Sequence, residues 1–210
     1  DIDVRNTQLL VGLAKANEKE SLTAQIQFYL IEMQRDEKNL ILATRNSQID
    51  TYSFRLLDTR KELENRVQLM TLLFVDEYRS HQDANKQQKI SDELDLQRLD
   101  GFNTAYKNYL RVHEEVRALS RLNSNVKAFD LSTGLARIQF EKAQNTLSIL
   151  VDTVDNEMAI NLVIANEKIN QARSISYITF VIAAIISVLV IYLVSRSLVF
   201  RTQRLALRAQ

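Results

Sequence analysis

The sequence contains no proline and no cysteine, and it has three glycines among its 210 residues. Proline breaks the interior of a helix and glycine weakens it, so their scarcity permits very long helices. The absence of cysteine excludes disulfide bonds and thiolate chemistry. Tryptophan is also absent and there are two histidines, His81 and His113, so the side chains that usually build metal and nucleophilic sites are scarce.

The chain is instead rich in Ala, Leu, Gln, Glu, Lys and Arg, which are good helix formers. No stretch alternates apolar and polar residues in the way of a half-buried strand. We therefore predict an all-α fold. The sequence has no Gly-rich phosphate loop, metal-ligand spacing or nucleophile–base arrangement, so we expect no cofactor and no enzymatic activity.

The longest apolar run is the segment 174–195, SISYITFVIAAIISVLVIYLVS, which contains no charged side chain. As a helix it would span roughly 33 Å, enough to cross the hydrocarbon core of a bilayer. Tyr177 and Tyr192 lie near its two ends, where aromatic side chains prefer the headgroup region. A buried core helix is the alternative, but such a helix almost always has a polar stripe. We predict that the segment is a transmembrane helix.

The charges on either side of this segment indicate its orientation. All charged residues after it are basic: Arg196, Arg201, Arg204 and Arg208. Because these are four of the chain's 27 Lys and Arg residues, residues 1–173 hold 23 basic against 26 acidic residues, a net charge of −3. Short basic flanks stay cytoplasmic, so residues 1–173 are predicted to lie outside the cytoplasm. The basic tail is expected to contact anionic lipid rather than nucleic acid.

Apolar side chains at steps of three and four residues predict four helices. The first runs over about residues 4–44, and the polar turn 45–48 separates it from the second, which ends in the polar run 80–89. The third ends at the turn-forming residues 123–125, and the fourth begins near Val126 and enters the membrane without a break. The predicted core positions are Ile26, Leu30, Met33, Leu40, Thr44, Ile49, Tyr52, Leu56, Leu63, Val67, Met70, Phe74, Leu99, Phe102, Tyr106, Tyr109, His113, Val116, Phe140, Ala143, Leu147, Leu150 and Val154.

These lengths predict an up-down-up-down four-helix bundle. The first helix and the part of the fourth before the membrane have about 45 and 48 residues, near 70 Å each, whereas the second and third have about 33 residues each. A long polar loop is expected between these two shorter helices. The predicted domains are an outer bundle (1–173), a transmembrane helix (174–195) and a cytoplasmic basic segment (196–210).

The first helix carries a family resemblance. Its segment RDEKNLILA is similar to the R-x-E-K-N-x-I-L-A signature in the first helix of the four-helix-bundle sensor domains of bacterial methyl-accepting chemotaxis receptors. The residues that carry this match best are Arg35, Glu37, Lys38 and Asn39.

Two further segments resemble the same family. The segment 119–128, LSRLNSNVKA, is similar to the stretch that joins the third and fourth helices of those receptors. The segment 195–198, SRSL, resembles the exit of their second membrane helix into a HAMP linker. The family usually has a proline a few residues later, where this chain has Arg201.

The resemblance implies a homodimeric receptor in the bacterial inner (plasma) membrane, with residues 1–173 periplasmic or extracellular. The outer bundle would bind a small molecule or a solute-loaded binding protein, and the last helix would shift along the membrane normal. Members of this family act on a cytoplasmic kinase complex through domains that follow the HAMP linker. Two alternatives stay open: the sensor of a histidine kinase, and a membrane-anchored scaffold or accessory subunit without its own ligand.

A cationic cluster partway along the bundle is the candidate ligand site. Counted from the distal turns, residues 35–38 of the first helix lie level with residues 60–66 of the second and with His113 of the third. A guanidinium group in such a place can pair bidentately with a carboxylate ligand. The candidate ligand-binding residues are Arg35, Lys38, Arg60, Arg66 and His113. The favoured alternative is that the charged residues 35–38 form ion pairs that fix the register of the helices.

The histidines and one acidic segment have ordinary interpretations as well. His113 lies on an aromatic seam and could titrate near neutral pH, but a hydrogen-bonded core histidine is the favoured interpretation. His81, in the polar run, is expected to be solvated. The acidic residues Asp92, Glu93 and Asp95 are expected to provide favourable charge at a helix N-terminus, with Ser91 or Asp92 as the cap, rather than to bind a divalent cation.

Overall fold

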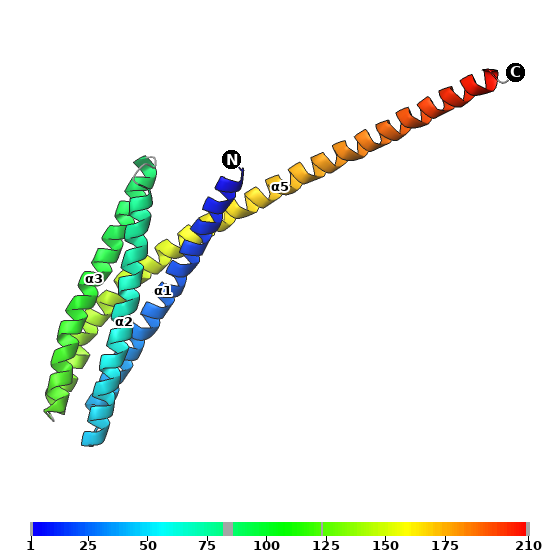
Figure 1. The fold of residues 1–210 in the computed structure, drawn as a ribbon. Helices are drawn as coiled ribbons and strands as arrows, with labels where there is room; N and C mark the ends of the chain where they lie inside the picture. Colours follow the sequence, from blue (N-terminus) through cyan, green and yellow to red (C-terminus); the bar gives the residue numbers. More distant parts are fainter. Residues whose placement is uncertain (1, 82–85, 123, 209–210) are drawn as a thin grey trace. The chain divides into compact units, whose positions relative to one another are not determined.

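The computed structural model describes residues 2–81, 86–122 and 124–208 (Figure 1). Its elements are α1 (Ile2–Leu42), α2 (Asn46–Ser80), α3 (Lys86–Arg121), α4 (Asn125–Leu131), the π-helix η1 (Ser132–Ala136) and α5 (Arg137–Arg208). The described residues contain helices and short connections and no strand. The predicted all-α class is therefore confirmed.

Two helix boundaries differ from the prediction. The second helix, α2, begins at Asn46, so the connection after α1 is shorter than the predicted turn. The third, α3, begins at Lys86, and the predicted long polar loop is therefore wrong. Gln and Lys are good helix formers, and a helix that is polar on several sides can run through solvent without an apolar marker in its sequence. Because α3 starts there, Ser91 lies inside the helix and is not its cap.

The chain forms two units, residues 1–161 and residues 162–210. In the first unit, α1, α2, α3 and the first part of α5 lie side by side (Figure 1). One hydrophobic cluster takes side chains from each of these helices, at steps of three and four residues. Its largest fully buried members include Ile26, Leu30, Met33 and Leu40 of α1, Leu56, Leu63 and Met70 of α2, Phe102 and Tyr109 of α3, and Leu147 and Leu150 of α5.

A smaller cluster packs Ile41 against Val112 and Val116 of α3, Ala128 of α4 and Ala136 of η1. The fourth helix was predicted to run without interruption from Val126, but the five residues of η1 interrupt the regular α-helix before α5 begins. π-helical turns are uncommon and frequently occur at functional sites.

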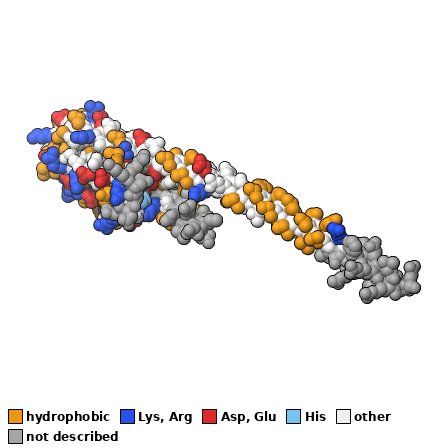
Figure 2. Space-filling model, turned by 90° about the horizontal axis from the view of Figure 1, so that it is seen from above, with side chains coloured by type: hydrophobic (Ala, Val, Ile, Leu, Met, Phe, Trp, Pro, Cys, Tyr) orange, Lys and Arg blue, Asp and Glu red, His pale blue; other side chains and the backbone are white. Residues whose placement is uncertain are grey.

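The second unit consists of the later part of α5, whose apolar side chains are exposed. Phe180 is 74% exposed and Val188 is 67% exposed. Figure 2 shows charged side chains spread over the surface of the first unit, whereas hydrophobic side chains cover most of the described surface of this helical segment. Within residues 125–193 there is a window of mean hydropathy 2.5, none of which is buried. By length and composition this is one helix able to cross a membrane.

Leu147 tests the contribution of α5 to the core. It is 1% exposed, so Leu147→Ala would leave a cavity and lower the free energy of unfolding by about 2–5 kcal/mol. The control is Ile149→Ala on the same helix, at a side chain that is 52% exposed. This change should alter the free energy of unfolding by no more than about 0.5 kcal/mol. Urea denaturation of the chain in detergent micelles, followed by circular dichroism, measures both. Equal losses would contradict the assignment of Leu147 to the core.

Candidate functional site

Two groups of interacting side chains in the first unit contain buried polar or charged residues. The core polar cluster comprises Glu37, Lys38, Tyr109, His113 and Ser132. The lysine cluster comprises Lys19, Phe74, Glu77, Asp95 and Glu157.

Glu37 is at the centre of the core polar cluster and is 1% exposed. On α1 it lies four residues after Met33 and three before Leu40, both of which are fully buried. Residues three and four apart share one face of a helix, so the same period that buries these apolar residues brings the carboxylate into the core.

A chain of hydrogen bonds connects Glu37 to η1. The hydroxyl of Ser132 donates to Oε1 of Glu37, and Nζ of Lys38 donates to Ser132 Oγ at 2.5 Å and to the Ser132 carbonyl at 3.2 Å. Nζ of Lys38 also lies 3.7 Å from Oε1 of Glu37, so its charge partly balances that of the carboxylate. The π-helix therefore supplies both the hydroxyl and the carbonyl that hold the Glu37–Lys38 pair.

The second carboxylate oxygen of Glu37, Oε2, faces His113. It lies 3.8 Å from Nε2, which is too long for a hydrogen bond. Among the described residues, neither Oε2 nor either ring nitrogen of His113 has a hydrogen-bond partner. Burial lowers the pKa of His113 to about 4, and burial also raises the pKa of Glu37. His113 is a core residue as predicted, but the expected hydrogen bond of its ring was wrong.

Tyr109 lies beside this pair. Its ring centroid is 5.5 Å from that of His113 and 5.5 Å from that of Phe140 on α5. Its buried hydroxyl interacts with the Glu37 carboxyl, but in the described part of the chain it makes no hydrogen bond of ordinary geometry. Burial raises the pKa of Tyr109 well above its usual value, and the nearby charge of Glu37 adds to this, so the phenol stays neutral.

The two arginines proposed on α2 are engaged by acceptors of the same chain. Arg60 pairs with Glu64 at 2.8 Å and with Glu114 of α3 at 2.6 Å. Arg66 donates to Oε1 of Gln25 on α1 at 2.7 Å. These contacts join neighbouring helices. Contacts of this kind can fix the register of the helices, which is the role that the favoured alternative gave to the charged residues of the first helix.

The predicted cationic cluster is only partly assembled. Lys38 and His113 both lie beside Glu37, whereas Arg60 and Arg66 have their own partners on α2 and its neighbours. Arg35 is exposed and pairs with Glu32 one turn earlier on α1. Asn39 is half-buried.

The lysine cluster is built around a buried ammonium group. Lys19 is 1% exposed and donates to Glu77 of α2 and, at 2.8 Å, to Glu157 of α5. Its Nζ also lies 4.7 Å from the ring centroid of Phe74, a cation–π contact. One cation thus connects three helices of the first unit.

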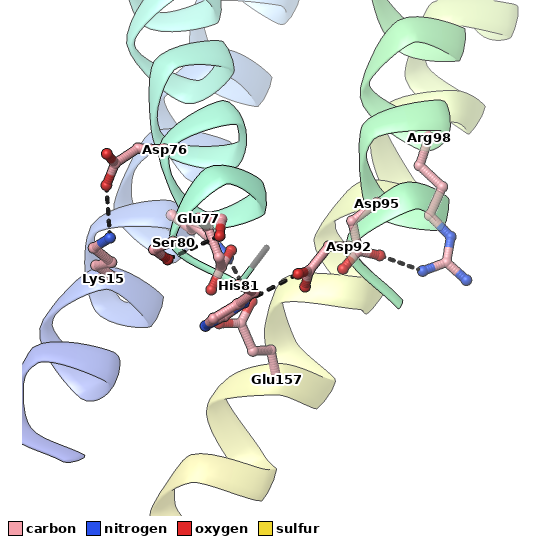
Figure 3. A network of polar contacts seen from close by, with 10 residues as sticks. Lys15, Asp76, Glu77, Ser80, His81, Asp92, Asp95, Arg98 and Glu157 are labelled. Atoms are coloured by element: carbon pink, nitrogen blue, oxygen red, sulfur yellow. Dashed lines mark hydrogen bonds and ion pairs between the residues drawn. The ribbon is translucent and has the colours of Figure 1, made fainter. Parts of the chain in front are cut away.

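Carboxylates from α2, α3 and α5 point toward the same region (Figure 3). Burial raises the pKa of Glu157 and that of Asp95. Burial alone would lower the pKa of Lys19, but Glu77 and Glu157 outweigh it, so the pKa of Lys19 is raised. Lys19 is therefore a permanent ammonium that stabilises the charge of two partly buried carboxylates.

His81 lies at the edge of this region. It was predicted to be solvated, but its ring also contacts a carboxylate. Its Nδ1 is 3.0 Å from Oδ2 of Asp92, which is 7% exposed (Figure 3). Asp95 accepts from Arg98 at 2.8 Å. In the described ranges no group of three or more His, Cys, Asp or Glu side chains is arranged to hold a metal ion.

The residues predicted to mark the membrane boundaries are on α5. Tyr177 is 72% exposed and Tyr192 is 61% exposed. Arg196 is exposed as well. The side chains of Arg201, Arg204 and Arg208 lie outside the described residues.

Sequence reasoning missed Lys19, Glu77, Glu157 and Ser132. The first three continue the apolar stripes of their helices: Lys19 is seven residues before Ile26, Glu77 follows Phe74 by three, and Glu157 follows Val154 by three. A charged residue at a stripe position is a signal for a buried ion pair. Ser132 gives no comparable signal, because its contacts depend on the local π-helix.

Comparison with known proteins adds no identification. No family model, no curated protein and no solved structure matches the chain. The resemblance to chemoreceptor sensor domains therefore rests on the motif residues of the sequence.

Replacing Lys19 tests the lysine cluster. Lys19→Met would leave Glu77 and Glu157 without their cation, so the free energy of unfolding at neutral pH should fall by about 3 kcal/mol. Without Lys19 the folded-state pKa of Glu157, which burial already raises, rises further above the unfolded value. Protonation of Glu157 then favours the folded variant as the pH falls, so the loss should shrink below about pH 5.

The matched control is Lys15→Met on the same helix. Lys15 pairs at 2.7 Å with Asp76, which is 68% exposed, so this change should lower the free energy of unfolding much less than Lys19→Met does. Urea denaturation at several pH values compares the two variants. If Lys19→Met is no more damaging than Lys15→Met, Lys19 does not hold the three helices together.

Proposed function

We propose that the chain is the sensor and transmembrane region of a chemoreceptor-type transducer. In this proposal residues 1–173 form an up-down-up-down four-helix bundle, with two long and two short helices, outside the cytoplasm of a bacterial cell. Residues 174–195 cross the inner membrane, and residues 196–210 begin a HAMP-like linker. The observation that carries the proposal is that α5 supplies core residues to the first unit and continues as helix through the apolar segment.

The continuity of α5 supports a mechanical route for a signal. Phe140, Leu147 and Val154 are buried in the core, and Glu157 is held by Lys19. A change in packing around these residues would displace α5, and a helix shifts by small translations or rotations of its whole length. The apolar segment would carry that displacement to a cytoplasmic output.

The input is proposed to be a small molecule or a solute-loaded binding protein. Arg60 and Arg66, the arginines proposed for a carboxylate ligand, already have acceptors on their own chain. A carboxylate ligand at these positions would have to replace those acceptors, so it would need to bind the arginines more strongly than they do. A partner that binds elsewhere on the bundle would not have to compete with them. A homodimer and a kinase complex that binds through domains after the HAMP linker complete the proposal.

The same contacts favour one other candidate function. If the only role of the charged residues is to fix the register of the helices, the chain is a membrane-anchored scaffold or accessory subunit without its own ligand. The scaffold needs the same membrane orientation but no transmission along α5.

Single cysteines test the orientation, because the chain has none of its own. Asn65 of α2 and Ser195 of α5 are both exposed. A membrane-impermeant maleimide should label Asn65→Cys in spheroplasts with intact membranes and should label Ser195→Cys only after lysis, because basic flanks stay cytoplasmic. Labelling of both positions, or of Ser195→Cys alone, before lysis would contradict the proposed topology.

Insertions in α5 test transmission. The chain is fused to the cytoplasmic part of a chemoreceptor, and alanines are inserted between Arg173 and Ser174. One residue rotates the following helix by about 100°, whereas seven add nearly two full turns. Kinase output should change strongly with one to three alanines and return toward the starting value with seven.

The control places the same insertions in the connection 43–45, which lies outside α5. Surface connections tolerate insertions, so the output should stay near its starting value there. An output that ignores the helical phase at residue 173 would contradict transmission through α5 and favour the scaffold.

A further inference from the structure

Several polar atoms without hydrogen-bond partners lie in one place in the core. In the described structure these are Oε2 of Glu37, Nδ1 and Nε2 of His113, and the hydroxyl of Tyr109. The side chains of Glu37 and His113 are each 2% exposed. Buried polar atoms are nearly always hydrogen-bonded, so a group of unsatisfied ones requires an explanation.

Two atoms of this group come from different helices and lie near each other, and both are acceptors when Glu37 is ionised and His113 carries its proton on Nδ1. These atoms are Oε2 of Glu37 and Nε2 of His113, 3.8 Å apart. Two facing acceptors cannot hydrogen-bond to each other. A single added proton changes this, because a protonated carboxyl group can donate to the ring nitrogen and thereby satisfy both atoms.

The remaining charges near the pair shift the pKa of His113 less than burial does: Glu114 raises it, whereas Arg117 and Arg60 lower it. On α1, Lys38 lies on the opposite side of the carboxylate, at Oε1, where Ser132 of η1 also donates. On α2, Arg60 is engaged by Glu64 and by Glu114.

On α3, Arg117 donates to Glu114, and Tyr109 is a neutral phenol because burial raises its pKa. From α5, Phe140 contributes an apolar ring that packs on Tyr109. The Tyr109 hydroxyl also interacts with the Glu37 carboxyl and lowers its pKa, although less than burial raises it. Among the described residues neither Oε2 of Glu37 nor Nε2 of His113 has a hydrogen bond of ordinary geometry.

We propose that Glu37 and His113 form a proton-binding site inside the first unit. A proton from solvent hydronium forms an O–H bond at Oε2 of Glu37, this O–H donates to Nε2 of His113, and the released product is water. The net charge of the pair changes from −1 to zero. Burial disfavours the carboxylate and the imidazolium alike, so Glu37 takes the proton before His113 does.

Binding of this proton alters the contact with η1. In the ionised state Lys38, Ser132 and the Glu37 carboxylate form a charge-assisted chain of hydrogen bonds. Neutralising Glu37 weakens the acceptor end of that chain. Because η1 leads directly into α5, proton uptake would alter the packing at the start of α5. The use of this change as a signal rests on the proposed sensor function, whereas the proton binding does not.

Nuclear magnetic resonance of the histidine rings tests the site in the full chain in detergent micelles. The chain has two histidines, so ¹⁵N-histidine labelling gives two ring signals, which His81→Gln assigns. The Nε2 shift of His113 should change with a midpoint above about 4.3, the ordinary pKa of a glutamate, while the ring remains a neutral imidazole. The imidazolium should form only at about pH 4.

Glu37→Gln should abolish the first transition, and Glu18→Gln, at an exposed glutamate of the same helix, should leave it unchanged. Persistence of the transition in Glu37→Gln would overturn the proposal. So would the formation of an imidazolium at His113 near pH 6.5, the ordinary pKa of histidine.

A second measurement covers the case in which Glu37→Gln does not fold. The pH-difference infrared spectrum of the wild-type chain should contain the C=O band of a buried protonated carboxyl group, and His113→Phe should lower its midpoint by about one pH unit because the acceptor is lost. An unchanged midpoint would overturn the proposal. If the proton binds as described but the kinase output of the fused receptor does not change with pH, the proton-binding site is supported. Its use as an input of the sensor is then contradicted.

Discussion

The constraint on which the first unit depends is the apolar stripe that each helix turns toward its neighbours. Steps of three and four residues bury Met33, Phe102 and Leu147 from separate helices in one cluster. The same geometry buries whatever else occupies the stripe, including Lys19 and Glu37. A charge that is taken out of water in this way must be paired or neutralised. Both buried polar clusters therefore follow from the same helix packing that buries the apolar side chains.

Much of the fold followed from the sequence because the stripes are clear. The all-α class and most core positions of α1, α2, α3 and α5 are those that the spacing predicts. Thr44 was wrongly placed in the core: it lies in the connection after α1 and is exposed, because the helix that would have turned it inward ends at Leu42. The start of α3 was missed because residues 86–90 are mostly polar, and polar helix-forming residues resemble a loop when periodicity is the only guide. The π-helix η1 was missed as well, since its sequence STGLA contains no signal that distinguishes it from a regular turn.

The candidate site was less predictable, for a physical reason. Periodicity tells which face of a helix a residue occupies. Which side chains of the neighbouring helices it contacts depends on how far each helix is displaced along the others. His113 was placed correctly on its stripe, yet its proximity to Glu37 depends on that displacement. Arg60 was one candidate for ligand binding, and in the structure this half-buried side chain pairs with Glu114 of α3.

The sharing of α5 between the core and the apolar segment also affects biosynthesis. The core is incomplete until Leu147, Leu150 and Val154 have been made, since they supply the last stripe. The apolar run begins at Ser174, and at about 5–20 residues per second a ribosome adds the intervening residues 155–173 in roughly one to four seconds. If the apolar segment enters a membrane as proposed, synthesis of the last core residues and delivery of the membrane segment would therefore be separated by only a few seconds.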